Sequence, residues 1–168
     1  MLIREGRPED LPRLLEIYNY YVEQTHITFD TNSVSLDARK AWFEGFSNEG
    51  PYRLFVAEAN GEANGHVSGY ASSREFRVKP AYARSVETSI YLGPDDCGTG
   101  SGSALYARLL EVLKDEAKVH RAYGGVALPN EASIALHERF GFERVATFSE
   151  VGFKFGRYWD VAWFERAL

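Results

Sequence analysis

The sequence predicts an α+β domain with a strand–loop–helix unit in its middle. Segments with helical periodicity and segments with strand-like alternation follow one another in the order ααβββαβαββ, which is typical of that class. The chain has 168 residues, of which 45% are hydrophobic and 26% charged. This length and composition suit one globular domain with a full core, and no repeat or linker-like shift in composition divides it.

The N-terminal part of the chain is predicted to be helical. Residues 7–24 carry one apolar helical stripe, formed by Leu11, Leu14, Leu15, Tyr18 and Val22. Ser35 is a candidate N-cap for a second helix, whose apolar face holds Leu36, Phe43 and Phe46. A short strand is also possible before the first helix, at residues 2–5.

The middle of the chain reads as strands joined by turns. Strands are expected at 53–59, 66–72 and 85–92, the last being β-branched and alternating, as in a central strand. Asn60-Gly61 and Asn64-Gly65 are signals of hairpin turns between the first two strands.

Toward the C-terminus, predicted helices and strands then alternate. A loop at 94–102 precedes a helix at 103–119, and a strand at 122–128 precedes a short helix at 131–140 that Gly141 caps. The last expected elements are an antiparallel strand pair at 144–155 and 158–165, around Gly156-Arg157.

The net charge and the cysteine content exclude several classes of protein. The formal net charge of -5 argues against nucleic acid as the main partner, because phosphate backbones bind basic surfaces. One cysteine, Cys97, rules out an internal disulfide and a cysteine-rich zinc site. No apolar run is long enough to cross a membrane, and charges interrupt the N-terminal stretch where a signal peptide needs an apolar one. We therefore expect a soluble cytoplasmic protein.

A glycine-rich loop is the first candidate binding site. Gly98-Thr99-Gly100-Ser101-Gly102 lies between an expected strand and an expected helix. Glycines let the backbone approach a ligand closely, and free N–H groups at a helix start favour a phosphate. The loop is not a Walker loop, because no Lys-Ser/Thr pair follows it, and its G-x-G-x-G spacing is a poor dinucleotide fingerprint. A plain flexible turn is the alternative.

A half-polar helix face is the second candidate. Asn130, Ser133, Ile134 and His137 lie at i, i+3, i+4 and i+7, on one face of a helix. Taken singly, Asn130 is an ordinary N-cap and His137 an ordinary structural histidine. Together they make a face that is unusual for mere core packing.

The third candidate precedes and enters the central strand. Arg74, Arg77, Lys79 and Arg84 oppose one acid, Glu75, in an otherwise acidic chain. This excess suits a clamp for a carboxylate or another anion, and a solvated loop is the alternative. Glu87 lies inside the strand itself, where a carboxylate is costly unless it is paired or functional.

Taken together, these residues resemble the GNAT N-acetyltransferases, and most closely their phosphinothricin and methionine sulfoximine acetyltransferase branch. The resemblance covers nearly the whole chain. Its motifs are Ile17-Tyr18-Asn19-Tyr20, Thr28-Phe29, Gly69-Tyr70-Ala71, Phe76-Arg77, Ala81-Tyr82, the strand 85–92, Gly100 with Gly102, Asn130 with Ala132-Ser133, Leu136–Phe142 and the ending from Val151 to Val161. It implies a single domain over 1–168 with the GNAT fold, a mixed and mostly antiparallel central sheet flanked by helices.

The resemblance also implies roles for particular residues. The donor is expected to be acetyl-CoA, without a metal, and to contact the backbone of Ile90, Tyr91 and Leu92. Its pyrophosphate is expected on Gly98, Thr99, Gly100, Ser101, Gly102 and Ser103, with Asn130 and Ser133 along its pantetheine arm. The resemblance implies Glu87 as the first candidate base and His137 as a second base or a proton donor. The acceptor, a small amino acid or analogue, is expected to contact Phe29, Arg77, Val78, Lys79 and Tyr82. Members of the branch commonly form dimers.

Two positions depart from the usual family pattern. Cys97 stands where the family usually has Arg or Gln, and His137 stands where many members have a Tyr that acts as an acid. Three alternatives to an amino-acid acetyltransferase remain: a polyamine or protein N-terminal acetyltransferase, a non-catalytic acyl-CoA-binding sensor, and, weakest, a redox protein that uses the loop for a dinucleotide. The basic segment at 74–84 argues against a polyamine.

Overall fold

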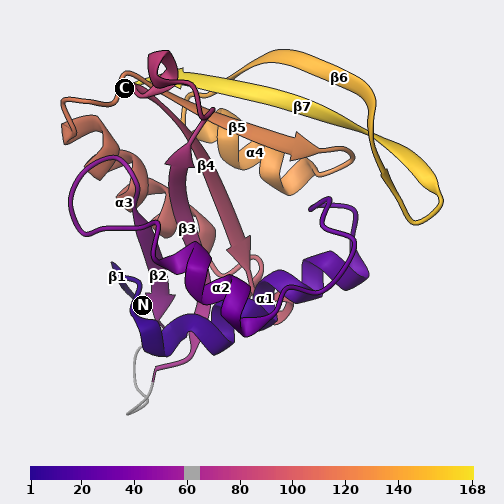
Figure 1. Cartoon of the computed structure of the whole chain (residues 1–168), viewed down its shortest axis with the longest axis horizontal. Helices are drawn as coiled ribbons and strands as arrows, with labels where there is room; N and C mark the ends of the chain where they lie inside the picture. The colour runs from indigo at the N-terminus through magenta and orange to yellow at the C-terminus, as the bar shows by residue number, and fades with distance from the viewer. Residues whose placement is uncertain (59–64) are drawn as a thin grey trace.

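The computed structural model describes residues 1–58 and 65–168. Within these residues, seven strands form one mixed sheet in the order β1-β2-β3-β4-β5-β7-β6 (Figure 1). All neighbouring strands are antiparallel except β4 and β5, which run parallel. The strands are β1 (Leu2–Glu5), β2 (Leu54–Glu58), β3 (Val67–Glu75), β4 (Ser85–Leu92), β5 (Arg121–Ala127), β6 (Glu143–Lys154) and β7 (Arg157–Ala167).

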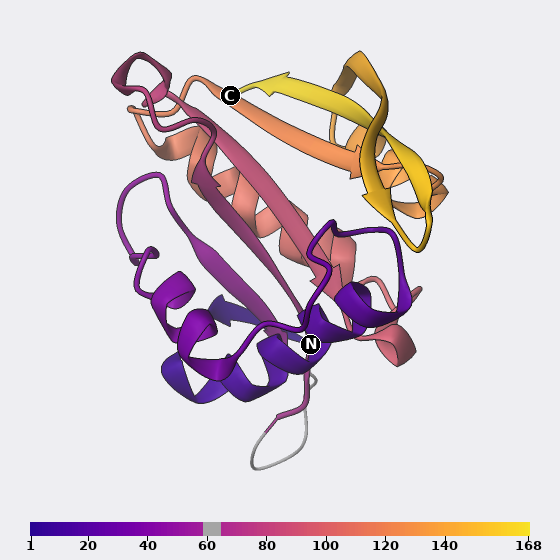
Figure 2. The same cartoon turned by 45° about the vertical axis from the view of Figure 1, so that its right-hand side comes forward.

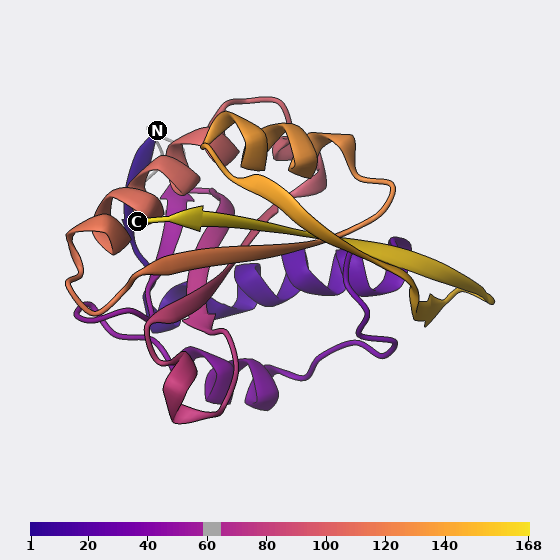
Figure 3. The same ribbon diagram turned by 90° about the horizontal axis from the view of Figure 1, so that it is seen from above.

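Helices cover both faces of this sheet. In the described part of the chain they are α1 (Leu11–Gln24), α2 (Leu36–Phe43), α3 (Ser101–Asp115) and α4 (Glu131–Arg139), with short 3-10 turns η1 (Pro8–Asp10), η2 (Pro80–Tyr82) and η3 (Pro94–Asp96). Figure 3 shows α1 and α2 on one side of the sheet and α3 and α4 on the other. The sheet is therefore the middle layer of three.

Strand β2 contributes side chains to the cores on both faces of the sheet. Successive side chains of a strand point to opposite sides. Accordingly, Leu54 and Val56 pack in a core cluster with Leu14 and Ile17 of α1. Phe55 and Ala57 instead join the larger cluster around α3. The continuous apolar run of β2 thus reflects burial on both faces.

The parallel strands β4 and β5 separate soon after they meet. They pair only over Ser85–Glu87 and Arg121–Tyr123. Beyond this point β5 stays paired with β7 as far as Ala127, while β4 stays paired with β3 as far as Leu92. Figure 2 shows the two strands opening like a V. From Thr88 onward, one edge of β4 consequently has no strand of the described part of the chain beside it.

Most of the predicted elements are confirmed. The predicted strands 2–5 and 85–92 match β1 and β4, and Ser35 Oγ accepts a hydrogen bond from the Ala38 N–H as the N-cap of α2. Helix α3 begins at Ser101 and ends at Asp115, whereas 103–119 was predicted. Its earlier start follows Gly100, the N-cap, whose φ is +89°, and Glu116 ends it with an extended backbone. The predicted turns at Asn60-Gly61 and Asn64-Gly65 involve residues outside the described part of the chain.

Candidate active site

Two hollows meet at the free edge of β4. The larger, here called the helix-side cavity, has a volume of about 440 Å³ and lies between β3, β4, α1 and α2. The smaller, here called the strand groove, has a volume of about 260 Å³ and lies between the diverging ends of β4 and β5 and the helix α4. Ser89 and Tyr91 line both. Two ligands seated in these hollows would therefore meet at the β4 edge.

Glu87 lines the helix-side cavity from the last residue of β4 that pairs with β5. Its side chain is about one-third exposed, and Oε2 lies 3.9 Å from Arg77 Nη1. Burial raises the pKa of the Glu87 carboxyl above its usual range, and the positive charge of Arg77 opposes that rise. A carboxylate with a raised pKa is a stronger proton acceptor than a surface glutamate, which suits a general base.

His137 reaches the strand groove from α4 and is 4% exposed. Its Nδ1 lies 2.8 Å from the carbonyl oxygen of Ser133, so the neutral ring donates the Nδ1 proton to that carbonyl. Nε2 is then an acceptor, and it is buried without a hydrogen-bond partner among the described residues. Burial lowers the pKa of His137, while the bond to Ser133 opposes the change. The ring is therefore neutral near pH 7.

His137 explains why one of the two glycines of β5, Gly124, has no side chain. A methyl group on Gly124 would overlap His137 Nε2. The imidazole thus takes up the space that a side chain at position 124 would need. The rings of Tyr106 and Phe142 pack against it in T-shaped pairs, with centroids 5.4 and 5.2 Å away. This packing fixes the direction of Nε2.

Side-chain hydrogen bonds are made at both ends of the stretch of β4 that leaves β5. Thr88 Oγ1 donates to the carbonyl oxygen of Tyr123 at 3.1 Å and shares a 2.8 Å hydrogen bond with Tyr106 Oη, just where the parallel pairing stops. Tyr21 Oη donates to the carbonyl oxygen of Leu92 at 2.8 Å. Residues Ile90, Tyr91 and Leu92, which were predicted to contact a donor through their backbone, all line the strand groove.

The glycine-rich loop has the backbone of an anion site. Gly98 and Gly100 have φ of +78° and +89°, a region that favours glycine. The first hydrogen bond of α3 runs from the Ala104 N–H to the Gly100 carbonyl. The N–H groups of Ser101, Gly102 and Ser103 therefore have no helical partner and point out of the positive end of the helix dipole. This arrangement fits the pyrophosphate of an acyl-CoA.

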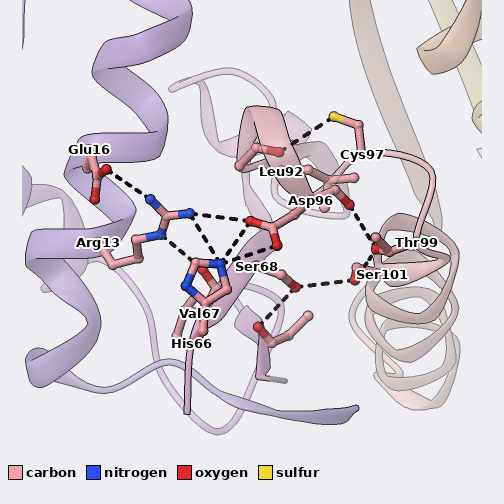
Figure 4. A network of polar contacts seen from close by, with 12 residues as sticks. Arg13, Glu16, His66, Val67, Ser68, Leu92, Asp96, Cys97, Thr99 and Ser101 are labelled. Atoms are coloured by element: carbon pink, nitrogen blue, oxygen red, sulfur yellow. Dashed lines mark hydrogen bonds and ion pairs between the residues drawn. The ribbon is translucent and has the colours of Figure 1, made fainter. Parts of the chain in front are cut away.

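A polar network fastens this loop to the rest of the molecule (Figure 4). The Asp96 carboxylate lies 3.3 Å from Arg13 Nη2 and 3.0 Å from His66 Nε2. Thr99 Oγ1 donates to the Asp96 carbonyl oxygen at 2.8 Å and contacts Ser101 Oγ at 2.8 Å. Asp96, which lies next to the loop in sequence, is thereby paired with the positive charge of Arg13.

Asn130 and Ser133 also lie at the groove. Asn130 Oδ1 accepts a hydrogen bond from the Ser133 N–H at 3.1 Å, so it is the N-cap of α4, and both residues line the groove with Cys97. One cation near the loop was missed in the sequence analysis. Arg139, at the end of α4, donates from Nη1 to Ser103 Oγ at 3.3 Å. Its distance of 36 residues along the chain hides this proximity from a sequence reading.

The predicted acceptor-binding residues lie outside the walls of both hollows. Arg77 packs over Phe76 and Trp163 and reaches Glu87 with its charged end. Val78 is 87% exposed, Tyr82 is 44% exposed and Lys79 is exposed before η2. The ring of Phe29 packs against the backbone of Gly152. Of these five residues, Arg77 is the one that contacts a predicted catalytic residue, Glu87.

Other cavity residues were also not foreseen. Arg39, Trp42 and Tyr70 line the helix-side cavity. A charged residue on a polar-looking helix gives no sign of burial, and the i, i+3 spacing of Arg39 and Trp42 is the one available signal. Within the described residues, no group of three His, Cys, Asp or Glu is placed to hold a metal ion. Nor is any described helix long and apolar enough to cross a membrane.

Comparisons with known proteins identify the family. The family model of the acetyltransferase (GNAT) domain matches residues 3–163. The chain is 52% identical to the phosphinothricin N-acetyltransferase of Streptomyces coelicolor over 166 residues, covering 99% of this chain and 95% of that protein. It is 36% identical to an L-methionine sulfoximine/L-methionine sulfone acetyltransferase of Pseudomonas paraeruginosa, covering 99% and 94% of the two chains.

A comparison with a solved structure identifies the same family. The phosphinothricin acetyltransferase of Sinorhizobium meliloti, in complex with acetyl-CoA, superposes with a TM-score of 0.91 at 32% identity, covering 99% of this chain and 88% of that one. These findings confirm the predicted family, fold and enzyme class. The chain therefore belongs to the GNAT acetyltransferase family, whose members take their acetyl group from acetyl-CoA.

Proposed function

We propose that this acetyltransferase transfers the acetyl group of acetyl-CoA to the amino group of a small amino acid or analogue of the phosphinothricin or methionine sulfoximine/sulfone type. The observation that carries the proposal is the meeting of the two hollows at Ser89 and Tyr91, with Glu87 beside that point. The names of the relatives give the class of acceptor. We further propose that residues 1–168 act as one domain, in the cytoplasm.

The donor is proposed to lie in the strand groove. The extended pantetheine arm would pair with the free edge of β4 at Ile90–Leu92, in place of the strand that β5 no longer provides. The pyrophosphate would lie on the N–H groups from Gly98 to Ser103, and Asn130 and Ser133 would contact the arm from α4. Arg139, which donates a hydrogen bond to Ser103, would add a positive charge near the loop, which Cys97 does not provide.

Glu87 is proposed to start the chemistry. An ammonium group has no lone pair with which to attack a thioester, so it must first lose a proton. Glu87, with its raised pKa and its place in the helix-side cavity, would accept that proton directly or through a water. The free amine nitrogen then bonds to the acetyl carbon, and the carbon–sulfur bond breaks with its electron pair leaving on sulfur.

His137 is proposed to complete the proton balance. The attacking nitrogen loses a second proton as the amide forms, and the departing thiolate gains one. His137 lines the same groove, and its Nε2, packed against Gly124 and unpartnered among the described residues, is the acceptor that would relay this proton. Its neutral state argues for this relay rather than for a permanently protonated acid.

The acceptor is proposed to occupy the helix-side cavity, with its amino group toward Glu87. Arg77, Val78, Lys79, Tyr82 and Phe29 are proposed to contact it at the outer end, where Arg77 already approaches Glu87. The cavity itself holds Arg39 and Arg74 as well as carboxylates. Such a mixture of charges suits a zwitterion better than a polycation, which argues against a polyamine acceptor.

The protein is also proposed to form a homodimer. The hairpin of β6 and β7 exposes large apolar side chains, each 47–59% exposed, at Val145, Phe148, Val151, Phe153, Phe155 and Tyr158. Apolar patches of this kind are typical of subunit contacts. Light scattering after gel filtration measures the mass: twice 19.0 kDa is expected, and a monomer at micromolar concentration would contradict the dimer.

The test of the function is release of thiol from acetyl-CoA in the presence of candidate amines. The screen holds phosphinothricin, methionine sulfoximine, methionine sulfone, the twenty amino acids, spermidine and a short peptide with a free N-terminus. Saturable release with an amino acid or its analogue is expected. Release only with spermidine or the peptide would replace the proposed acceptor class. Acetyl-CoA binding without release on any amine would instead indicate a sensor.

A further inference from the structure

Arg39 is a buried cation without an anionic partner among the described residues. Its side chain, from α2, is 4% exposed, and it takes part in none of the ion pairs found among the described residues. Two of its guanidinium nitrogens, Nε and Nη2, are buried and have no hydrogen-bond partner there. Charged groups are rarely buried in this way unless something compensates them.

Aromatic rings surround the guanidinium and provide part of that compensation. Its central carbon lies 3.4 Å from the ring centroid of Trp42, 5.0 Å from that of Tyr70 and 5.1 Å from that of Tyr18. Cation–π contacts stabilise the positive charge. However, ring faces accept no conventional hydrogen bond, so the N–H groups of Nε and Nη2 stay unsatisfied.

A third unsatisfied donor, the hydroxyl of Tyr70, lies near the two nitrogens of Arg39. Tyr70 is 1% exposed, and its hydroxyl has no hydrogen-bond partner among the described residues. Burial raises the pKa of Tyr70, so the hydroxyl keeps its proton and can donate it. Arg39, Tyr70 and Trp42 all line the helix-side cavity, as does Glu87. Three buried donors thus border the cavity in which the acceptor is proposed to lie.

The two guanidinium nitrogens form a fork. Nε and Nη2 are on the same edge of the planar group, and their N–H bonds match the two oxygens of a carboxylate or phosphinate. We propose that Arg39 and Tyr70 form an oxyanion subsite that binds an anionic end of the acceptor while Glu87 handles its amino group. This inference rests on the proposed function and adds to it a residue that determines acceptor specificity.

Binding at this subsite involves Trp42. Both nitrogens are shielded from water in this structure, so an entering oxyanion draws the guanidinium toward the cavity and away from its stack on Trp42. The carboxylates that line the cavity, Asp30, Glu75 and Glu87, do not occupy the fork. Asp30 instead accepts a 2.7 Å hydrogen bond from Tyr18 Oη. The fork is therefore left for a ligand.

The kinetic test compares Arg39→Met with Lys40→Met, its exposed neighbour on α2. The acceptors are methionine sulfone, its carboxamide, phosphinothricin and phosphinothricin carboxamide. Arg39→Met is expected to raise KM at least about tenfold for an acceptor that keeps the recognised oxyanion, as loss of a charge-assisted pair implies. The KM of an acceptor that lacks that oxyanion is expected to change little in Arg39→Met. Tyr70→Phe is expected to act in the same direction with a smaller effect.

The pattern of the carboxamides identifies the group that is bound. If the α-carboxylate occupies the fork, both carboxamides become insensitive to Arg39→Met. If the phosphinate occupies it, phosphinothricin carboxamide remains sensitive. An equal change in KM for all four acceptors, or an effect of Lys40→Met as large as that of Arg39→Met, would reduce Arg39 to a packing residue. Thermal unfolding and the acetyl-CoA dissociation constant of each variant are measured alongside, and both are expected to stay near wild type.

A binding measurement separates this inference from the proposed function. Methionine sulfone is titrated into the enzyme without acetyl-CoA while tryptophan fluorescence is recorded. A saturable change that Trp42→Phe abolishes and Arg39→Met weakens is expected. If wild type turns over no amino acid yet shows this change, the proposed function fails and the subsite stands. If turnover occurs but neither the fluorescence nor KM depends on Arg39, the subsite fails alone.

Discussion

Arg77 Nη1 lies 3.9 Å from Oε2 of Glu87, a residue that lines the helix-side cavity. At this distance the guanidinium favours the ionised form of the carboxyl without forming a close pair. Burial raises the pKa of Glu87 and Arg77 restrains that rise. The residue proposed to clamp the acceptor thus also adjusts the proposed base.

Removing Arg77 is therefore expected to shift the pH profile. Glu87 acts as a base only when deprotonated, and without Arg77 its pKa rises further, so a higher pH is needed to ionise it. In Arg77→Gln the acidic limb of the kcat profile should move to higher pH. Arg84→Gln, an exposed arginine in the same segment, is the control and should leave the limb in place.

Salt provides a second check on the same relationship. Arg77 is 48% exposed, so ions screen its charge. Added salt should move the acidic limb of the wild type in the same direction as the mutation, and it should move the limb of Arg77→Gln less. An acidic limb that is identical in wild type and Arg77→Gln would show that Glu87 does not set it.

Replacing Glu87 by Gln tests the base itself. The change keeps the size of the side chain and removes its ability to take a proton, so kcat is expected to fall by about 10²-fold or more. The dissociation constant of acetyl-CoA should be unchanged, because Glu87 lines the helix-side cavity and not the strand groove. Stopped-flow thiol release and a donor-binding titration measure the two quantities. Unaltered kcat would remove Glu87 as the base.

The glycine loop can be tested against a matched strained glycine. Gly100 and Gly50 have φ of +89° and +79°, and a side-chain methyl would meet nothing within 4 Å at either position. Valine at either site is therefore expected to strain the backbone by about 1–2 kcal/mol, with no clash at its Cβ atom. Urea unfolding should show a similar loss of unfolding free energy in both variants.

The two variants should differ only in donor binding. Gly100 is the N-cap of α3, so a shift of its backbone redirects the free N–H groups of the loop, whereas Gly50 lies in the segment before β2. Weaker acetyl-CoA binding is expected for Gly100→Val alone. Equal affinity in the two variants would contradict the assignment of the loop to the pyrophosphate.

Much of this fold could be predicted because its signals are local. The strand Ser85–Leu92 was predicted to the residue, since its β-branched alternation depends on nothing else in the chain. The separation of β4 from β5 was not predicted, because it arises when β7 holds β5 beyond Tyr123. The groove that this separation creates is a property of strand pairing and leaves no mark in either strand's sequence.

Some residues of the candidate site could likewise be predicted from local signals, and others could not. Glu87 and His137 could be singled out because polar residues at those places in a strand and a helix are unusual. The burial of Arg39 depends on Trp42, Tyr70 and Tyr18, which come from three elements, so its charge alone suggested a surface residue. The roles of Lys79, Val78 and Tyr82 remain predictions, since they line neither hollow.

Gly124 and His137 are expected to be coupled in stability. A methyl group at position 124 overlaps the imidazole, so Gly124→Ala should destabilise the fold by about 1–3 kcal/mol, as overpacking does. In His137→Ala the ring is absent, and the same substitution should cost little or even stabilise. Urea unfolding of the four proteins of this double-mutant cycle gives the coupling energy. Additive effects would show that the ring does not occupy the space at Gly124.

The buried imidazole also predicts how stability depends on pH. Because burial lowers the pKa of His137 in the folded state, the unfolded chain binds a proton there more readily. Below the unfolded pKa of about 6.5, this difference destabilises the fold, and the loss grows as pH falls toward the folded pKa. In His137→Gln the fall in unfolding free energy between pH 7 and pH 5 should therefore be smaller than in wild type. His120→Gln, at an exposed histidine, is the control for the loss of a histidine as such. If His137→Gln and wild type lose stability in parallel over this range, the ring is protonated as easily in the fold as outside it, and its proposed action as a neutral acceptor fails with it.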